Sequence, residues 1–296
     1  MKNKYLFVVV LLVVLLLAGV GLTKAYVAME EDGSDEEITV VTSFYPMYIA
    51  AMNIIGDTKG VTLENLSEPQ TGCLHDYQLT PADMKLLSGA DIFVVNGGGI
   101  ESFLSEVAEE YDNLTIVNSC DNLTLLEDNA HAWMNIADYR EQVATILQGL
   151  VAADPAQADA YQNNAATYDK KLEALQQKAD ELKSELADKD IIIFHEAYEY
   201  VADEYDMQVT YVMDLDEERQ VSAGEVADVI SQIDEHNVKV VLAEELYGKD
   251  MGDTVEAESD AKVYYLNTLV RGDYEADSYI TGMEENIKIL KEAFTQ

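Results

Sequence analysis

Three histidines in this sequence have the residue type and the placement of a transition-metal site. The chain has four histidines in total, and His75, His131 and His195 each stand where a predicted loop or strand meets a predicted helix. Zinc in proteins takes neutral imidazole and usually has four ligands. We therefore expect these three side chains, from three separate segments, to converge on one divalent ion. The remaining one, His236, lies near a predicted helix end in a polar stretch, where we expect a surface residue.

The residues after His75 predict how the first of these side chains is positioned. Thr80 and Pro81 are a suitable helix cap and first-turn proline, and a buried strand is predicted at 90–95 after this helix. Ligand sites of α/β proteins lie at such strand and helix ends. We therefore place His75 at the rim of an α/β layer.

Short buried strands alternate with helices in both halves of the chain. The predicted strands fall at 38–42, 61–66, 90–95, 114–117, 191–194, 209–212, 238–243 and 262–266. This alternation is typical of parallel sheets covered by helices. The predicted fold class is therefore α/β, with two lobes that each have a parallel-sheet core.

One long helix is predicted between the two lobes. The run that Asp154 and Pro155 begin reaches Ala187 without another glycine or proline, and its apolar residues recur at three- and four-residue steps. A helix of about 33 residues spans roughly 50 Å, which is long for one compact domain. We therefore expect a rigid backbone helix, 154–187, that joins an N-terminal lobe, 38–153, to a C-terminal lobe, 188–296. The metal site is expected in the interlobe cleft.

The N-terminus has the composition of an export signal. Lys2 and Lys4 precede an unbroken apolar run, so we interpret residues 1–28 as a signal peptide or N-terminal anchor. The acidic stretch 29–37 is expected to be a linker. The rest of the chain should then work outside the cytoplasm, at the cell surface or in the periplasm.

The charge balance limits the partners of the chain. There are 57 acidic and 18 basic residues, for a formal net charge of -39. Such a surface repels nucleic acid and anionic lipid and attracts cations. We therefore expect no nucleic-acid partner, and membrane association only through the signal, the anchor or a membrane protein.

The two cysteines, Cys73 and Cys120, each precede a predicted ligand loop. An even pair in an oxidising exterior favours a disulfide, which would brace the loop of His75. The competing interpretation is that Cys73 is a thiolate ligand.

Three motifs surround the three histidines. Residues 73–83 read Cys-Leu-His-Asp-Tyr-Gln-Leu-Thr-Pro-Ala-Asp, residues 129–134 read Asn-Ala-His-Ala-Trp-Met, and residues 194–198 read Phe-His-Glu-Ala-Tyr. In this order they resemble the ligand motifs of the zinc/manganese ABC-transporter substrate-binding proteins, and the resemblance covers nearly all of residues 38–294. It implies two α/β lobes joined by a rigid backbone helix, a metal held between them, and delivery of that metal to an ABC-type permease. We expect the protein to be a monomer and not an enzyme.

The resemblance also bears on the choice of metal. In that family a histidine as third ligand, as His195 is here, goes with zinc, and a carboxylate goes with manganese. Ligand softness agrees, because imidazole suits zinc and carboxylate oxygen suits manganese. We expect Zn²⁺ as the cargo, with Mn²⁺ or iron as the alternative.

The sequence departs from the family pattern at two places. Asn129-Ala130 replaces the usual Asp-Pro before the second histidine, and Asn267 and Val270 stand where the fourth ligand is often an acid. The fourth ligand stays open between water, Glu244 and Asp273.

Two other classes of protein stay open. Three histidines and a water also describe a hydrolytic zinc site, in which Glu196 is the candidate general base, although the second histidine of the metalloprotease helix motif does not follow His195. The other class is a surface adhesin or structural protein with no metal role.

Overall fold

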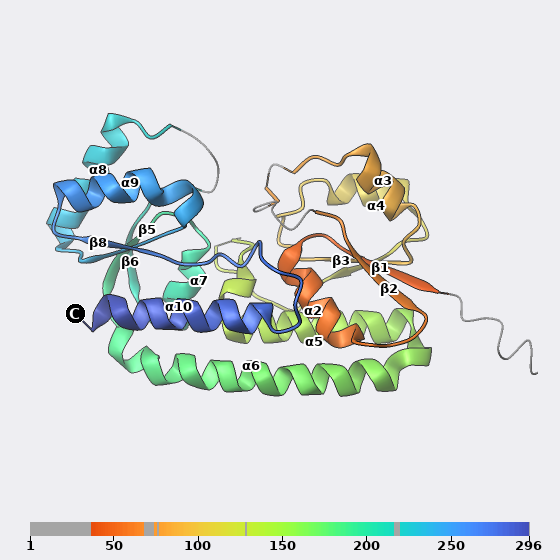
Figure 1. The fold of residues 1–296 in the computed structure, drawn as a ribbon. Coiled ribbons are helices and arrows are strands. Elements are labelled where there is room, and N and C mark those ends of the chain that lie inside the picture. The colour runs from red at the N-terminus through yellow and green to blue at the C-terminus, as the bar shows by residue number, and fades with distance from the viewer. Residues whose placement is uncertain (1–36, 68–73, 76, 128, 216–219, 296) are drawn as a thin grey trace, which may run out of the picture. The chain divides into compact units, whose positions relative to one another are not determined.

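The computed structural model describes residues 37–67, 74–75, 77–127, 129–215 and 220–295 (Figure 1). The predicted signal or anchor, nearly all of the predicted linker and Cys73 lie outside these residues. Within the described part, no helix combines the length and the apolar character needed to cross a membrane.

Two parallel four-stranded sheets form the cores of the two lobes. The first contains β1 (Ile38–Thr42), β2 (Val61–Asn65), β3 (Ile92–Val95) and β4 (Thr115–Asn118) in the order β2-β1-β3-β4. The second contains β5 (Asp190–Ile193), β6 (Gln208–Val212), β7 (Val240–Ala243) and β8 (Lys262–Tyr265) in the order β6-β5-β7-β8. In register, Val40 of β1 lies opposite Leu63 and Ile92. The two sheets thus have the same topology, and the predicted fold class is confirmed.

The helices follow the strands in the expected alternation, with two additions. The described α-helices are α2 (Tyr45–Ile55), α3 (Pro81–Leu87), α4 (Leu104–Glu110), α5 (Ile136–Ala153), α6 (Ala158–Leu186), α7 (Tyr198–Glu204), α8 (Ala223–His236), α9 (Glu245–Glu258) and α10 (Ser278–Phe294). Two 3-10 turns, η1 (Ala132–Met134) and η2 (Pro155–Gln157), precede α5 and α6. Helices α5 and α9 were not predicted from the sequence.

The long helix α6 belongs to a layer of helices. It packs against α2, α5 and α10, and Figure 1 shows α5 and α10 each running along α6. The helix buries the predicted stripe, and Ala165 in addition. The predicted residues are Tyr161, Tyr168, Leu172, Leu175, Ala179, Leu182 and Leu186. The last helix, α10, contacts β8 but packs mainly along α6. The lobe and linker boundaries stay predictions.

The helix start after His75 forms as its residue types predict. The Thr80 hydroxyl accepts a hydrogen bond from the Asp83 N–H at 3.3 Å, and the Asp83 carboxylate accepts one from the Thr80 N–H at 2.7 Å. This reciprocal capping box, with Pro81 in the first turn, fixes where the chain leaves the loop of His75.

The glycine triplet after β3 is a tight turn closed by a buried carboxylate. Gly97, Gly98 and Gly99 have φ values of 83°, 65° and 93°. The Glu101 carboxylate accepts hydrogen bonds from the N–H of Gly97 and of Asn96, at 2.9 and 2.7 Å. The side chain of Glu101 thus already fills this turn, which agrees with a structural turn rather than a phosphate-binding loop.

The structure contradicts the predicted disulfide at Cys120, the one of the two cysteines that it describes. Cys120 is a buried free thiol, and the amide nitrogen of Gln142 lies 3.3 Å from its sulfur. Burial raises the pKa of this thiol to about 12, so it stays protonated.

Candidate metal centre

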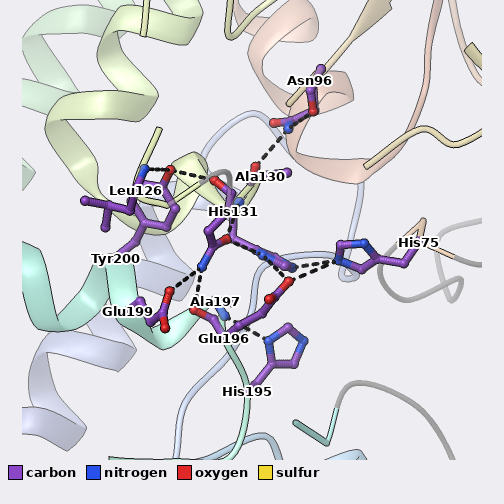
Figure 2. Close-up of polar contacts among 12 residues, drawn as sticks. His75, Asn96, Leu126, Ala130, His131, His195, Glu196, Ala197, Glu199 and Tyr200 are labelled. Atoms are coloured by element: carbon purple, nitrogen blue, oxygen red, sulfur yellow. Dashed lines mark hydrogen bonds and ion pairs between the residues drawn. The ribbon is translucent and has the colours of Figure 1, made fainter. Parts of the chain in front are cut away.

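Imidazoles from both lobes lie close to one another (Figure 2). Nε2 of His75 lies 3.4 Å from Nε2 of His131, and the ring centroids of His131 and His195 are 5.1 Å apart. His75 follows β2 and His131 immediately precedes η1, whereas His195 follows β5. The structure therefore brings the three predicted residues together, while His236 lies exposed at the end of α8.

Local backbone structure explains these positions. His131 caps η1, and its carbonyl accepts a hydrogen bond from the Met134 N–H at 3.0 Å. The His195 carbonyl likewise accepts one from the Tyr198 N–H at 3.1 Å, where α7 begins. Trp133 stands beside His131 with ring centroids 5.0 Å apart, and its indole N–H donates to the Thr268 carbonyl at 2.9 Å. Each histidine is thus held at a junction between two elements.

Glu196 adds an oxygen donor to the histidines. Its Oε1 lies 3.6 Å from Nε2 of His75 and 3.4 Å from Nδ1 of His131, and Figure 2 shows the carboxylate between the two rings. Ligand atoms of these three residues all lie within 4.8 Å of one another. His195 borders this group through its ring contact with His131. From the sequence, Glu196 was a candidate only as a general base. Its position beside a candidate ligand at a strand end was the signal for a role in the metal site.

Asn129 fixes the tautomer of His131. The amide oxygen of Asn129 accepts from the backbone N–H of His131 at 3.0 Å, and it lies 2.8 Å from the ring Nδ1. The amide nitrogen donates to the Glu196 carbonyl at 2.9 Å. A backbone N–H can only donate and a carbonyl can only accept, so the amide orientation is determined. His131 therefore carries its proton on Nδ1, and the lone pair of Nε2 is directed toward His75.

Burial keeps His131 neutral. The side chain is fully buried, and the pKa of His131 is held well below its ordinary value, first by burial and then by the neighbouring His195 and His75. Neutral imidazole is the form that binds a metal ion, and no proton has to leave this ring at neutral pH.

The neutral ring of His195 has the opposite tautomer to that of His131. Its Nδ1 accepts a hydrogen bond from the Ala197 N–H at 3.0 Å, so the neutral ring has its proton on Nε2. A metal bound through Nε2 requires the proton to move to Nδ1 and this contact to open.

Glu244, one of the two acids considered as fourth ligand, and Asn267, which stands at the family's acid position, each have a partner of their own. The Glu244 carboxylate forms an ion pair with Arg271 at 3.0 Å, and the Asn267 amide oxygen accepts from the Leu269 N–H at 2.8 Å. Across the described residues, the group of His75, His131 and Glu196 is the one set of three or more acidic, histidine or cysteine side chains close enough to share an ion.

Comparison with known proteins gives the class of this chain. Residues 40–293 match the family described as ZnuA, the periplasmic component A of a zinc-uptake complex. The chain belongs to this family of metal-binding ABC-transporter substrate-binding proteins.

Three similar proteins indicate the range of the family. The high-affinity zinc uptake system protein ZnuA of Bacillus subtilis is 28% identical over 287 residues, which cover 88% of this chain and 89% of that protein. The manganese-binding lipoprotein MntA of Halalkalibacterium halodurans is 26% identical over 308 residues and is covered to 100%, as is this chain. The solved structure of FpvC from Pseudomonas aeruginosa with Mn²⁺ has a TM-score of 0.77 at 27% identity, over 87% of this chain and 98% of that one.

These relatives are substrate-binding transport proteins, so the protein is not an enzyme and the hydrolase alternative is excluded. Their names include both zinc and manganese. The comparisons therefore support a divalent metal as the class of cargo. The choice among these metals has to be argued from the ligands of this site.

Proposed function

We propose that the protein captures Zn²⁺ outside the cytoplasm and delivers it to an ABC-type permease. The proposed ligands are His75, His131 and His195, with Glu196 as an oxygen donor beside them. The observation that carries this proposal is the meeting of three imidazoles from two lobes, with the lone pair of His131 directed into the group.

The donor set favours zinc. Three imidazoles and one carboxylate make four ligands, the number zinc usually takes, and imidazole suits zinc better than manganese. The manganese alternative is supported by one specific observation, the carboxylate of Glu196 within reach of two rings. Oxygen donors are the ligands that Mn²⁺ prefers.

Capture begins with electrostatic attraction. A formal net charge of -39 raises the local concentration of cations near the surface without choosing among them. Selection then occurs at the histidines, where burial of His131 removes water and holds the ring neutral. Because the ligands come from both lobes, metal binding favours the arrangement of the lobes in which all ligands reach the ion. A permease that contacts both lobes can sense this arrangement.

The proposal includes the partner, the oligomeric state and the location of the protein. The permease is the partner that receives the ion, and the protein acts as a monomer. Residues 1–28 serve as the export signal or the anchor that keeps the protein at the outer face of the membrane.

Metal competition tests this proposal. Purified, metal-free protein is titrated with Zn²⁺, Mn²⁺ and Fe²⁺ against a chromophoric chelator. We expect one equivalent of Zn²⁺ to bind much more tightly than Mn²⁺, at a dissociation constant well below micromolar. Tighter binding of Mn²⁺ would support the manganese alternative, and no binding tighter than micromolar would refute the transport role and favour an adhesin.

A further inference from the structure

Asn129 has every hydrogen-bonding position of its side chain occupied at the junction between the lobes. Its oxygen receives the backbone N–H and the ring Nδ1–H of His131. Its nitrogen donates one hydrogen to the Glu196 carbonyl and the other to the Glu199 carboxylate, both at 2.9 Å. The first two partners belong to the N-terminal lobe and the last two to the segment that follows β5.

Only an asparagine-like group meets these four demands at this length. Two donors must be accepted and two acceptors must be supplied with hydrogens, and a primary amide has two lone pairs and two N–H groups. A carboxylate at position 129 would still accept both groups of His131. The amide nitrogen of Asn129 lies 2.9 Å from the Glu199 carboxylate. A carboxylate oxygen in its place would put a second negative charge at about that distance, where like charges repel.

Other contacts hold the same junction on both sides of His131. The Tyr200 hydroxyl donates to the Asn129 carbonyl at 2.7 Å and accepts from the Leu126 N–H at 3.2 Å. Beyond the histidine, the Ile136 N–H donates to the Glu204 carboxylate at 2.8 Å. Tyr200 and Glu204 both lie on α7, so this helix binds the backbone before and after the second ligand.

We propose that Asn129 is a positioning residue that couples the two halves of the metal site, and that Asn129 and Glu199 act as a matched pair. The amide oxygen selects the Nδ1–H tautomer of His131, and the amide nitrogen joins that histidine to the turn that carries His195 and Glu196. This proposal rests on the proposed function and adds to it the residue that sets the geometry between the lobes.

The experiment separates the two roles of the amide with four variants of the full chain. Asn129→Leu removes both roles, Asn129→Asp keeps the acceptor and removes the donor, and Glu199→Ala removes only the partner. The double variant Asn129→Asp/Glu199→Gln exchanges donor and acceptor across the junction. Zinc affinity is measured by chelator competition, and the tautomer of His131 by ¹⁵N chemical shifts of the metal-free protein.

For the tautomer, we expect Nδ1–H in the wild type, in Asn129→Asp and in Glu199→Ala, and a loss of that preference in Asn129→Leu. For zinc, we expect Asn129→Asp to weaken binding about 10- to 100-fold, as outer partners of metal ligands do, and the double variant to recover most of the loss. A merely structural role would lower the melting temperature without changing the tautomer or producing this rescue.

The proposal is overturned if Asn129→Asp binds zinc as tightly as the wild type. It is also overturned if adding Glu199→Gln to Asn129→Asp restores none of the lost zinc affinity. If Asn129→Asp fails to fold, Glu199→Ala replaces it, because this variant removes the same hydrogen bond between Asn129 and Glu199. Zinc binding by Glu199→Ala as tight as in the wild type would then overturn the proposal. The tautomer measurement needs no metal. A wild type that binds no metal therefore refutes the proposed function, whereas an unchanged tautomer in Asn129→Leu refutes the role of Asn129 alone.

Discussion

The ring of His195 lies edge-on to the ring of His131, with centroids 5.1 Å apart and an interplanar angle of 88°. One imidazole follows a strand of the second sheet and the other begins a turn that leads into α5. This contact joins the lobes through two side chains that have the chemistry of metal ligands. Its consequences for binding and stability can be tested by substitution.

Removal of a histidine from the cluster should abolish tight binding. We expect His195→Ala to weaken zinc binding by orders of magnitude, because one of about four ligands is lost. His236→Ala is the matched control, since this exposed residue of α8 lies outside the cluster. Isothermal or chelator titration measures both, and equal effects of the two changes would refute the site assignment.

The carboxylate of Glu196 should matter more for manganese than for zinc. Glu196→Gln removes a charged oxygen that lies 3.6 Å from His75 and 3.4 Å from His131. Since oxygen donors suit Mn²⁺ and imidazoles suit Zn²⁺, we expect the manganese affinity to fall by the larger factor. Competition titrations of Glu196→Gln and of Glu235→Gln, an exposed change on α8, provide the comparison. A fall confined to zinc would contradict this role.

Asp138 should make the apoprotein less stable near neutral pH. Burial, and then the carboxylates of Asp203 and Glu204, raise the pKa of Asp138 to about 6 from its ordinary value of 3.8. The folded state therefore holds a proton that the unfolded state has lost, and stability falls as the pH rises from about 4 through about 6.

The corresponding substitution is Asp138→Asn. We expect it to raise the free energy of unfolding above pH 6 by roughly 1 kcal/mol, a value reduced for solvent screening of this half-buried group. The gain should shrink as the pH falls and vanish below about pH 3, where the carboxyl group is neutral in both states. Urea unfolding across this range measures it, with Glu141→Gln on the exposed side of α5 as control. A gain independent of pH would contradict the electrostatic cause.

The turn after β3 should tolerate alanine at one glycine and not at another. A Cβ at Gly97 would lie 1.9 Å from the side-chain oxygen of Asn118, whereas one at Gly99 would meet no atom within 4 Å. Both have positive φ, so Gly99→Ala should cost about 1–2 kcal/mol from the backbone alone. Gly97→Ala should cost clearly more, because the clash is added. Denaturant unfolding compares the two, and similar losses would show that the clash is relieved by movement of Asn118.

Much of the fold could be predicted because its strands are short apolar runs between turn residues. The long helix could also be predicted, since its buried stripe recurs at helical spacing from Tyr161 to Leu186. Helix α9 was missed because its two glycines, Gly248 and Gly252, argue against a helix. Gly252 is needed because a Cβ there would clash with the Tyr265 hydroxyl, so close packing on β8 outweighs helix propensity.

The three histidines could be singled out because they are rare in the chain and stand at element junctions. Composition gave no reason to choose Glu196 among 57 acidic residues, and its position directly after His195 was the one signal in the sequence that could have identified it. The role of Asn129 was also hidden, because its partners Glu196 and Glu199 are distant in sequence and belong to the other lobe. Only the tertiary fold brings those groups together.

The central claim is that imidazoles from both lobes bind one metal ion, and anomalous diffraction tests it most directly. Crystals of the protein grown with one equivalent of Zn²⁺ are measured on both sides of the zinc absorption edge. We predict a single strong peak roughly 2.0–2.1 Å from a ring nitrogen of each of His75, His131 and His195. We also expect the contact between Nδ1 of His195 and the Ala197 N–H to be open. A peak bound elsewhere, or no peak among these three rings, would contradict the account.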